Sequence, residues 1–417
     1  MINITAEVIT IGDELLYGQV LDTNSGWIGN EMAKIGIRVM HNVTVSDTQQ
    51  HIINAIDIAL QRANIVLITG GLGPTKDDLT KDCLARYFNC GFKQDQDALN
   101  DITELCKKRG VPVNELNWQQ SFIPEISTAI RNPIGTAPGM WFEFENRILV
   151  SMPGVPFEMK KMMFETVIPR LEHQLELPPI KHEVVHTIGI AESALAQKLE
   201  DWENNLHETI KLAYLPGKGI VKLRLTGIDD GTGKLEDVMK QELNRLKNLI
   251  PEFIFGYGDT TLEKEIANLL RARELSISTA ESCTGGYVAH RLTTVIGATS
   301  YFKGGIVSYL EEVKKKQVGV KAATLKKHGA VSKQTAIEMA NGVRIKLGSD
   351  IGLSTTGIAG PGGGEPEKPI GTIWIAVATE KETFTKKLQL SHDRKLNIEY
   401  TAVYLFNLLR QTLQQKD

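Results

Sequence analysis

The sequence predicts a multidomain α/β protein with a parallel-sheet domain over residues 1–176, a small α+β domain over 177–254 and a further α/β domain over 255–417. The length of 417 residues suits two to four domains, because a domain usually holds about 100–200 residues. Strand and helix patterns alternate along the first part, which is typical of parallel sheets. These patterns are interrupted at Pro178-Pro179 and at Pro251, where we place the boundaries.

The first part begins with the order strand, helix, strand, helix, strand. Residues 7–12 are an apolar run that ends in glycine, and helical periodicity follows at 25–35. A second strand starts at Gly36, residues 49–62 carry apolar side chains on one helical face, and residues 65–69 are a buried strand. This order implies a parallel sheet with helices on both faces. Further helices are expected at 76–88, 95–108 and 157–175.

The middle and last parts also alternate between strands and helices, in shorter units. For the middle part we expect strands at 182–187, 210–215 and 221–226, and helices at 192–199 and 235–249. The last part opens with a helix at 261–273 and a strand at 275–280, and it ends in a long helix from about residue 393 to residue 413.

Composition excludes several classes of protein. Apolar residues make up 42% and charged residues 23%, as in an average soluble protein with buried cores. The net charge of −3 argues against a large nucleic-acid interface. The sequence has no basic, apolar leader and no apolar run long enough for a membrane span. Four cysteines without metal-type spacing favour a reduced, cytoplasmic setting.

Two loops in the first part carry residues suited to a phosphate ligand. They are residues 12–24 and 69–80, and both follow strands whose carboxyl ends should lie at one edge of the sheet. Glycines let backbone amides approach phosphate oxygens, and a helix starting near Lys76 would add its positive end. Asp77 and Asp78 could hold a divalent cation. The alternative is a tight turn with carboxylates that only cap the helix.

The segment 278–286 is the most informative of the last part, because it places Ser282 between a predicted strand and a helix. Amides near the start of that helix could stabilise the oxyanion formed when an amide carbonyl is attacked. The alternative is a serine that caps the helix, with glycines that serve packing. A thiol nucleophile at Cys283 is a further possibility.

A nucleophilic serine needs a base, and no histidine lies near Ser282 within its motif. Lys314 could act as the base if burial lowers its pKa, and Tyr309 could relay or position the proton. A plain charged helix face is the alternative for residues 314–316. The glycine-dense residues 357–364 could wrap a phosphate or ribose, or they could be a surface loop.

Taken together, the motifs resemble those of the CinA (competence/damage-inducible) family over nearly the whole chain. Gly-Gly-x-Gly at 70–73 with Asp-x-Thr at 78–80 is similar to the molybdopterin-binding fold, and the segments 132–139 and 152–159 match the narrower family. Ala-Glu-Ser-Cys-Thr-Gly-Gly at 280–286 is similar to the family's nicotinamide-nucleotide amidase domain.

The resemblance implies two hydrolytic activities. The first part would cleave ADP-ribose with a divalent metal (Mg, Mn or Co), and the last part would deamidate nicotinamide mononucleotide without a cofactor. It also implies a homodimer, and no nucleic-acid or membrane partner is expected. The implied catalytic set is Ser282, Lys314 and Tyr309, and the implied metal ligands are Asp78 and Asp77. The implied substrate-binding residues are Thr284, Gly285, Gly286, Gly360, Gly363, Gly364 and Arg394 in the last part, and Gly70, Gly71, Gly73 and Thr75 in the first.

Two other readings stay open. The chain could be a nucleotide-binding sensor whose middle part contacts a partner. That part faintly resembles a KH module, but it has no clear Gly-x-x-Gly loop, and we interpret it as a spacer or dimer-arranging domain. Molybdopterin handling by the first part is the third reading, and it rests on fold analogy alone.

Overall fold

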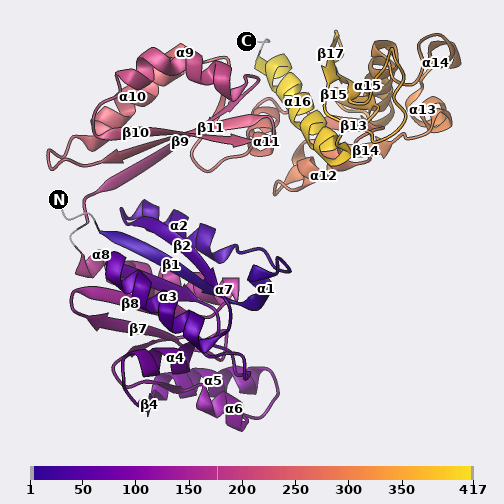
Figure 1. The fold of residues 1–417 in the computed structure, drawn as a ribbon. Helices are drawn as coiled ribbons and strands as arrows, with labels where there is room; N and C mark the ends of the chain where they lie inside the picture. Colours follow the sequence, from indigo (N-terminus) through magenta and orange to yellow (C-terminus); the bar gives the residue numbers. More distant parts are fainter. Residues whose placement is uncertain (1–3, 176, 415–417) are drawn as a thin grey trace. The chain divides into compact units, whose positions relative to one another are not determined.

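A computed structural model describes residues 4–175 and 177–414 of the chain. The chain forms two compact units, Met1–Lys181 with Ile228–Gly233 and His182–Gly227 with Lys234–Asp417 (Figure 1). The predicted multidomain α/β class is confirmed, because each unit contains helices and its own sheet or sheets. The middle and last parts of the chain share one compact unit, and the predicted bounds of three domains remain a prediction.

The first unit is built on a mixed six-stranded sheet. Its strands, with a separate short pair β4–β5, are β1 (Thr5–Ile11), β2 (Arg38–Val45), β3 (Ile65–Thr69), β4 (Phe92–Gln94), β5 (Phe122–Pro124), β6 (Thr128–Ile130), β7 (Gly139–Phe144) and β8 (Arg147–Met152). The sheet order is β2-β1-β3-β8-β7-β6. The first four of these strands are parallel to one another, as expected, whereas β7 is antiparallel to β8 and β6 is antiparallel to β7.

Helices cover both faces of this sheet, and β1 shows why. Val8 and Ile9 are adjacent and so point to opposite faces. Val8 belongs to an apolar core with Ile28 of one helix, and Ile9 belongs to a second core with Ile56 of another. The helices are α1 (Asp13–Leu16), α2 (Asn24–Lys34), α3 (Gln49–Arg62), α4 (Thr80–Tyr87), α5 (Gln96–Lys108), α6 (Glu115–Gln119), α7 (Pro156–Met162) and α8 (Ile168–Gln174), with a π-helical turn at Met163–Val167 before α8.

The expected helix start near Lys76 is wrong, because α4 begins at Thr80. The Asp78 carboxylate accepts a hydrogen bond from the Thr75 amide at 2.9 Å, and the Thr80 amide donates to the Gly71 carbonyl at 3.0 Å. These bonds hold the segment before Thr80 in a loop. The positive end of α4 therefore lies four residues later than the sequence suggested.

The middle part of the chain folds as a four-stranded sheet with two helices packed on it. Its elements are β9 (Ile180–Ile188), α9 (Glu192–Asn204), β10 (Ile210–Gly217), β11 (Ile220–Ile228), α10 (Leu235–Leu249) and β12 (Ile254–Tyr257). The sheet order is β10-β11-β9-β12. Leu199 and Trp202 of α9 and Leu246 of α10 share one core with Leu223 of β11. The predicted α+β class of this part is confirmed.

The last part has a five-stranded sheet in the order β14-β13-β15-β16-β17. The strands are β13 (Ile277–Glu281), β14 (Phe302–Val307), β15 (Ile351–Gly357), β16 (Thr372–Ala378) and β17 (Thr383–Gln389). The first three in the sheet order are parallel to one another, β16 is antiparallel to β15, and β17 is antiparallel to β16. The helices are α11 (Leu262–Ala272), α12 (Tyr287–Thr293), α13 (Glu311–Val318), α14 (Ala322–His328), α15 (Lys333–Leu347) and α16 (Arg394–Gln414).

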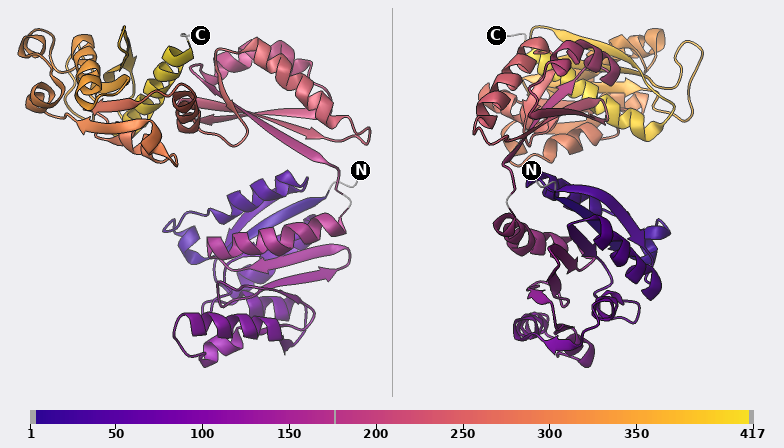
Figure 2. Two further views of the ribbon diagram at one scale, coloured as in Figure 1. Left: turned by 180° about the vertical axis from the view of Figure 1, so that it is seen from behind. Right: turned by 60° about the vertical axis from the view of Figure 1, so that its left-hand side comes forward.

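Helices also pack on both faces of this sheet. Leu270 of α11 and Phe406 of α16 share a core with Leu353 of β15, whereas Met339 of α15 packs with Ala280 of β13 in another. Figure 2 shows α16, in yellow, beside the strands from two further sides. Within residues 4–175 and 177–414, no helix is both long and apolar enough to cross a membrane.

Candidate active site

The sequence-predicted residues of the last part meet at the carboxyl ends of three parallel strands. Ser282 directly follows β13, Tyr309 and Lys314 follow β14, and the glycine-rich loop follows β15. These three strands are neighbours in the sheet, so their ends lie at one edge. The strand order therefore brings together segments that lie more than 70 positions apart in the sequence.

Ser282 and Lys314 form the centre of the site. Lys314 Nζ lies 2.9 Å from Ser282 Oγ, and both side chains are buried, with Lys314 only 1% exposed. The same amine donates to the carbonyl of Ser308 at 2.7 Å and to that of Tyr309 at 2.9 Å. Lysine is among the residues that are almost never fully buried without a partner. A buried amine with three oxygen neighbours is thus a specific arrangement.

The partners of Lys314 suit the neutral amine. A carbonyl oxygen can only accept hydrogen bonds, so the Ser308 and Tyr309 carbonyls take two N–H groups. A neutral amine then has one lone pair left, which can accept the Ser282 hydroxyl proton at the third contact. Burial lowers the pKa of Lys314 below its usual range, although Cys283 and Glu311 oppose this shift. Both the geometry and the electrostatics fit a general base.

Glu281 organises the loop between Ser282 and α12, and our sequence reasoning did not single it out. Its buried carboxylate accepts hydrogen bonds from the amides of Gly286, Val288 and Ala289 at 2.8–3.0 Å. It also accepts one from the Thr284 hydroxyl at 2.7 Å. The expectation that the amides at this helix start serve an oxyanion is therefore wrong for these three, because Glu281 already binds them.

The Cys283 side chain lies in the apolar core of this part of the chain. It is 5% exposed and packs in the same apolar cluster as Val288 and Leu292. Burial raises the pKa of its thiol to about 12, so the thiol stays protonated near neutral pH. The structure thus favours Ser282 over Cys283 as the nucleophile.

Tyr309 and Arg394 link the site to the glycine-rich loop. The Tyr309 side chain is 54% exposed, and its hydroxyl accepts a hydrogen bond from an Arg394 nitrogen at 3.1 Å. The other terminal nitrogen of Arg394 donates to the Gly360 carbonyl at 2.8 Å. Tyr309 contacts Lys314 through its backbone carbonyl, while its hydroxyl contacts Arg394. Arg394 was expected to bind phosphate, and here it ties two sides of the site together.

Glycines shape both loops at this edge. Gly285 and Gly286 have φ of 60° and 101°, and Gly360 and Gly363 have φ of 90° and 86°. Such positive values are strained for residues with a side chain. At Gly360 a Cβ atom would also lie 3.0 Å from the carbonyl oxygen of His392. The backbone around Ser282 and before α16 therefore depends on these glycines.

The glycine loop of the first unit also lies at the carboxyl ends of parallel strands. Gly70 has φ of 114°, and Gly71 has φ of 65°. A Cβ atom at Gly70 would collide with the Ile11 carbonyl, so glycine lets this loop approach the end of β1. The Thr80 hydroxyl donates to the Gly70 carbonyl at 2.9 Å. The loop is therefore fixed by its own residues and by α4.

Asn24 lines a small cavity beside this loop. The only sequence signal for Asn24 was its position at the end of the loop 12–24. The cavity has a volume of about 120 Å³, and Asn24, Thr69 and Gly154 are among the residues that line it. Asn24 donates to the Thr69 hydroxyl at 3.1 Å and to the Gly154 carbonyl at 2.8 Å. Its own Oδ1 atom is buried without a hydrogen-bond partner among the described residues.

The predicted metal ligands do not form a ready-made metal site. The Asp78 carboxylate accepts hydrogen bonds from the amide and the hydroxyl of Thr75, and Asp77 is exposed. In the described ranges 4–175 and 177–414, no three His, Cys, Asp or Glu side chains come together as metal ligands. Asp47 was not predicted, and burial raises the pKa of its carboxyl, with the charges of Glu14, Asp13 and Asp78 acting in the same direction.

Three family models match successive parts of the chain. The probable molybdopterin binding domain matches residues 7–173, the KH domain of the damage-inducible protein CinA matches 182–256, and the CinA C-terminal domain matches 259–413. The middle part is thus matched by a KH-type model, in line with its faint resemblance to a KH module.

Relatives match over the full length. A CinA-like protein of Cytophaga hutchinsonii is 45% identical over 99% of this chain and 99% of its own length. Another CinA-like protein, from Amoebophilus asiaticus, is 42% identical over 98% of this chain and 99% of its own length. Among solved structures, the competence damage-inducible protein A (ComA) of Klebsiella pneumoniae is 34% identical, covering 37% of this chain and 97% of that chain with a TM-score of 0.37.

Proposed function

This chain belongs to the CinA family, and we propose that its last part hydrolyses nicotinamide mononucleotide to nicotinate mononucleotide and ammonia. The contact between Lys314 Nζ and Ser282 Oγ carries the proposal, since it pairs a nucleophile with a buried base. The choice of substrate rests on the resemblance of residues 280–286 and 357–364 to the family's amidase segments.

In the first half of the reaction, Lys314 takes the Ser282 hydroxyl proton while Oγ forms a bond to the carboxamide carbon. Glu281 accepts hydrogen bonds from the amides of Gly286, Val288 and Ala289 but not from those of Cys283 and Thr284. We therefore assign the binding of the oxyanion to the Cys283 and Thr284 amides. The tetrahedral intermediate then collapses, the C–N bond breaks, and ammonia leaves with the proton from Lys314. An ester on Ser282 remains.

In the second half, water hydrolyses this ester. Lys314 takes a proton from the water, whose oxygen adds to the ester carbon. Collapse of this intermediate breaks the bond to Ser282 Oγ, which regains its proton from Lys314. The acid product is released, and the serine–lysine pair is restored, so that no cofactor or metal enters the balance.

Ammonia release from nicotinamide mononucleotide by the purified full-length protein tests the proposal. Ser282→Ala should lower the rate by about a thousandfold or more, because the nucleophile is lost. Ser193→Ala, at an exposed position on α9, is the control and should keep the wild-type rate. Near-normal ammonia release by a folded Ser282→Ala protein would reject the assignment. Tight binding of the mononucleotide by the wild type without any ammonia release would favour a sensor instead.

We further propose that the first unit cleaves ADP-ribose. The observations in favour are the close approach of the Gly70 loop to the end of β1 and the unpartnered Asn24 oxygen in the neighbouring cavity. Because Asp77 and Asp78 do not form a ready-made metal site, we derive no step through a metal.

The assay measures AMP release from ADP-ribose with Mg²⁺, Mn²⁺, Co²⁺ or a chelator. Asn24→Ala should lower this rate and leave ammonia release unchanged, since the residue lies in the other compact unit. Turnover of molybdopterin rather than ADP-ribose under any of these conditions would favour the molybdopterin reading.

A further inference from the structure

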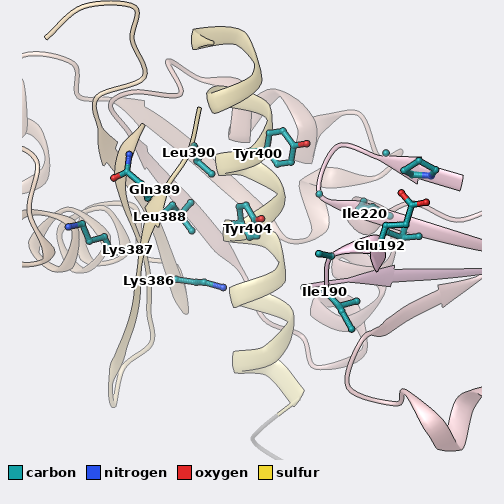
Figure 3. Close-up of a pocket in the computed structure, with 16 residues that line it drawn as sticks. Ile190, Glu192, Ile220, Lys386, Lys387, Leu388, Gln389, Leu390, Tyr400 and Tyr404 are labelled. Atoms are coloured by element: carbon teal, nitrogen blue, oxygen red, sulfur yellow. The ribbon is translucent and has the colours of Figure 1, made fainter. Parts of the chain in front are cut away.

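A second cavity lies in the unit that contains Ser282, but away from the serine site. It has a volume of about 470 Å³, is open to solvent, and is lined by the β10–β11 turn, the start of α9, strand β17 and helix α16 (Figure 3). This volume is within the range of about 300–1,000 Å³ that small-molecule pockets usually have. None of the residues that surround Ser282 line it. The cavity is therefore separate from the proposed amidase chemistry.

Two tyrosines of α16 form one wall of the cavity. Tyr400 and Tyr404 are one helical turn apart, and their rings lie 6.3 Å apart between centroids at an angle of 25°. Both project from α16 toward the residues on the opposite wall (Figure 3). Gly219 in the β10–β11 turn lies so close that a Cβ atom there would be 3.3 Å from the Tyr400 ring. Nearly parallel rings of this kind suit a planar ligand that stacks with an offset.

One lysine of β17 adds positive charge beside these rings. Lys386 Nζ lies 5.3 Å from the centroid of the Tyr404 ring, whereas the Lys387 side chain points away from α16 (Figure 3). In the described part of the chain, the Lys386 ammonium group has no carboxylate partner. Lys218 at the hairpin is different, because it pairs with Glu399 at 2.6 Å. The free positive charge beside the rings is thus that of Lys386.

We propose that this cavity binds a nucleoside monophosphate, with its base on Tyr400 and Tyr404 and its phosphate on Lys386. Two aromatic rings with an ammonium group beside them suit a ligand in which a planar base is joined to a phosphate. Glu192 on the opposite wall would repel phosphate, but it can accept a hydrogen bond from a ribose hydroxyl or a base amino group. Inorganic phosphate alone would leave the rings uncovered. This proposal does not depend on the amidase reaction.

Calorimetric titration of the full-length protein with AMP, adenosine and inorganic phosphate tests the site. AMP should bind more tightly than either of the other two. Lys386→Glu and Tyr404→Ala should each weaken one AMP site by about tenfold or more, through lost charge pairing and lost stacking. Tyr404→Phe keeps the ring and should bind within about threefold of the wild type. Lys381→Glu, at an exposed lysine outside the cavity, is the matched charge control and should have no effect.

Circular dichroism and thermal melting show whether each variant is folded. If folded Lys386→Glu and Tyr404→Ala proteins both bind AMP as the wild type does, the proposal is wrong, because AMP then binds elsewhere in the chain. Adenosine or inorganic phosphate that binds as tightly as AMP would also overturn it. Ammonia release is measured in the same variants, so a loss of AMP binding with an intact amidase separates this site from the proposed function.

Discussion

Replacement of Lys314 by methionine removes the amine but keeps a side chain of similar length in the same buried space. Ser282 then has no base, because the lysine nitrogen is the group at 2.9 Å from its hydroxyl. General base catalysis is worth about a hundredfold to ten-thousandfold in rate, and we expect kcat to fall by that amount. KM for the mononucleotide should change far less, since Lys314 is bonded to Ser282 and to two carbonyls rather than placed to hold phosphate.

The same substitution has a smaller effect on stability that can be measured separately. The buried Ser308 carbonyl loses its donor, which costs about 1–3 kcal/mol. Lys315→Met on the exposed side of α13 is the control and should change neither stability nor rate. Thermal melting and steady-state ammonia release on both variants separate a loss of fold from a loss of chemistry.

The pH dependence provides a second check on the same base. Because burial lowers the pKa of Lys314, the amine becomes neutral at a lower pH than an ordinary lysine. The wild-type rate should therefore rise with pH and level off below the usual lysine range. Lys314→Arg should stay inactive across this range, since a guanidinium keeps its proton. A folded Lys314→Met protein with a rate within about threefold of wild type would refute the assignment, because a lost base costs far more.

Three further outcomes are expected. Glu281→Gln should lower ammonia release and destabilise the protein by about 1–3 kcal/mol, because an amide group then faces backbone N–H donors. A melting temperature equal to that of the exposed control Glu312→Gln would contradict this. Iodoacetamide should modify Cys90 before Cys283, because the buried Cys283 thiol has a pKa raised to about 12. Peptide mass spectrometry measures the order of labelling. Rapid labelling of Cys283 with loss of activity would favour the Cys283 thiol as the nucleophile. Arg394→Lys should raise KM by about tenfold, since an ammonium cannot reproduce the two-armed contact of the guanidinium; an unchanged KM would exclude this role.

Much of the fold follows from local patterns in the sequence. The predicted helix at 49–62 and the strand at 65–69 coincide with α3 and β3, because their apolar periodicity is strong and their ends are well marked. The start of α4 could not be predicted in this way. It depends on the bonds of Asp78 and Thr80 to the preceding loop, which local helix propensity does not contain.

The burial of Lys314 was only partly accessible from sequence. Three consecutive lysines look like a charged helix face, and for Lys315 and Lys316 this is true because both are exposed. Val318 lies four residues after Lys314 and is also buried, so the two share the inner face of α13. That spacing is a signal that could have distinguished Lys314. The carbonyls that hold its amine, however, come from the turn after β14 and become visible only in three dimensions.

Glu281 explains why an acid and a lysine can be buried around the same serine without pairing with each other. Both side chains are 1% exposed, and an ion pair between them would keep Lys314 protonated and unable to act as a base. The carboxylate of Glu281 is instead satisfied by three amides and the Thr284 hydroxyl, and Glu281 is not among the groups that raise the pKa of Lys314. The bonds that fix the loop thus also leave the lysine free to lose its proton. Glu281→Gln should lower the rate as well as the stability because the loop that positions Ser282 loses these bonds, and not because an acid becomes free to pair with Lys314.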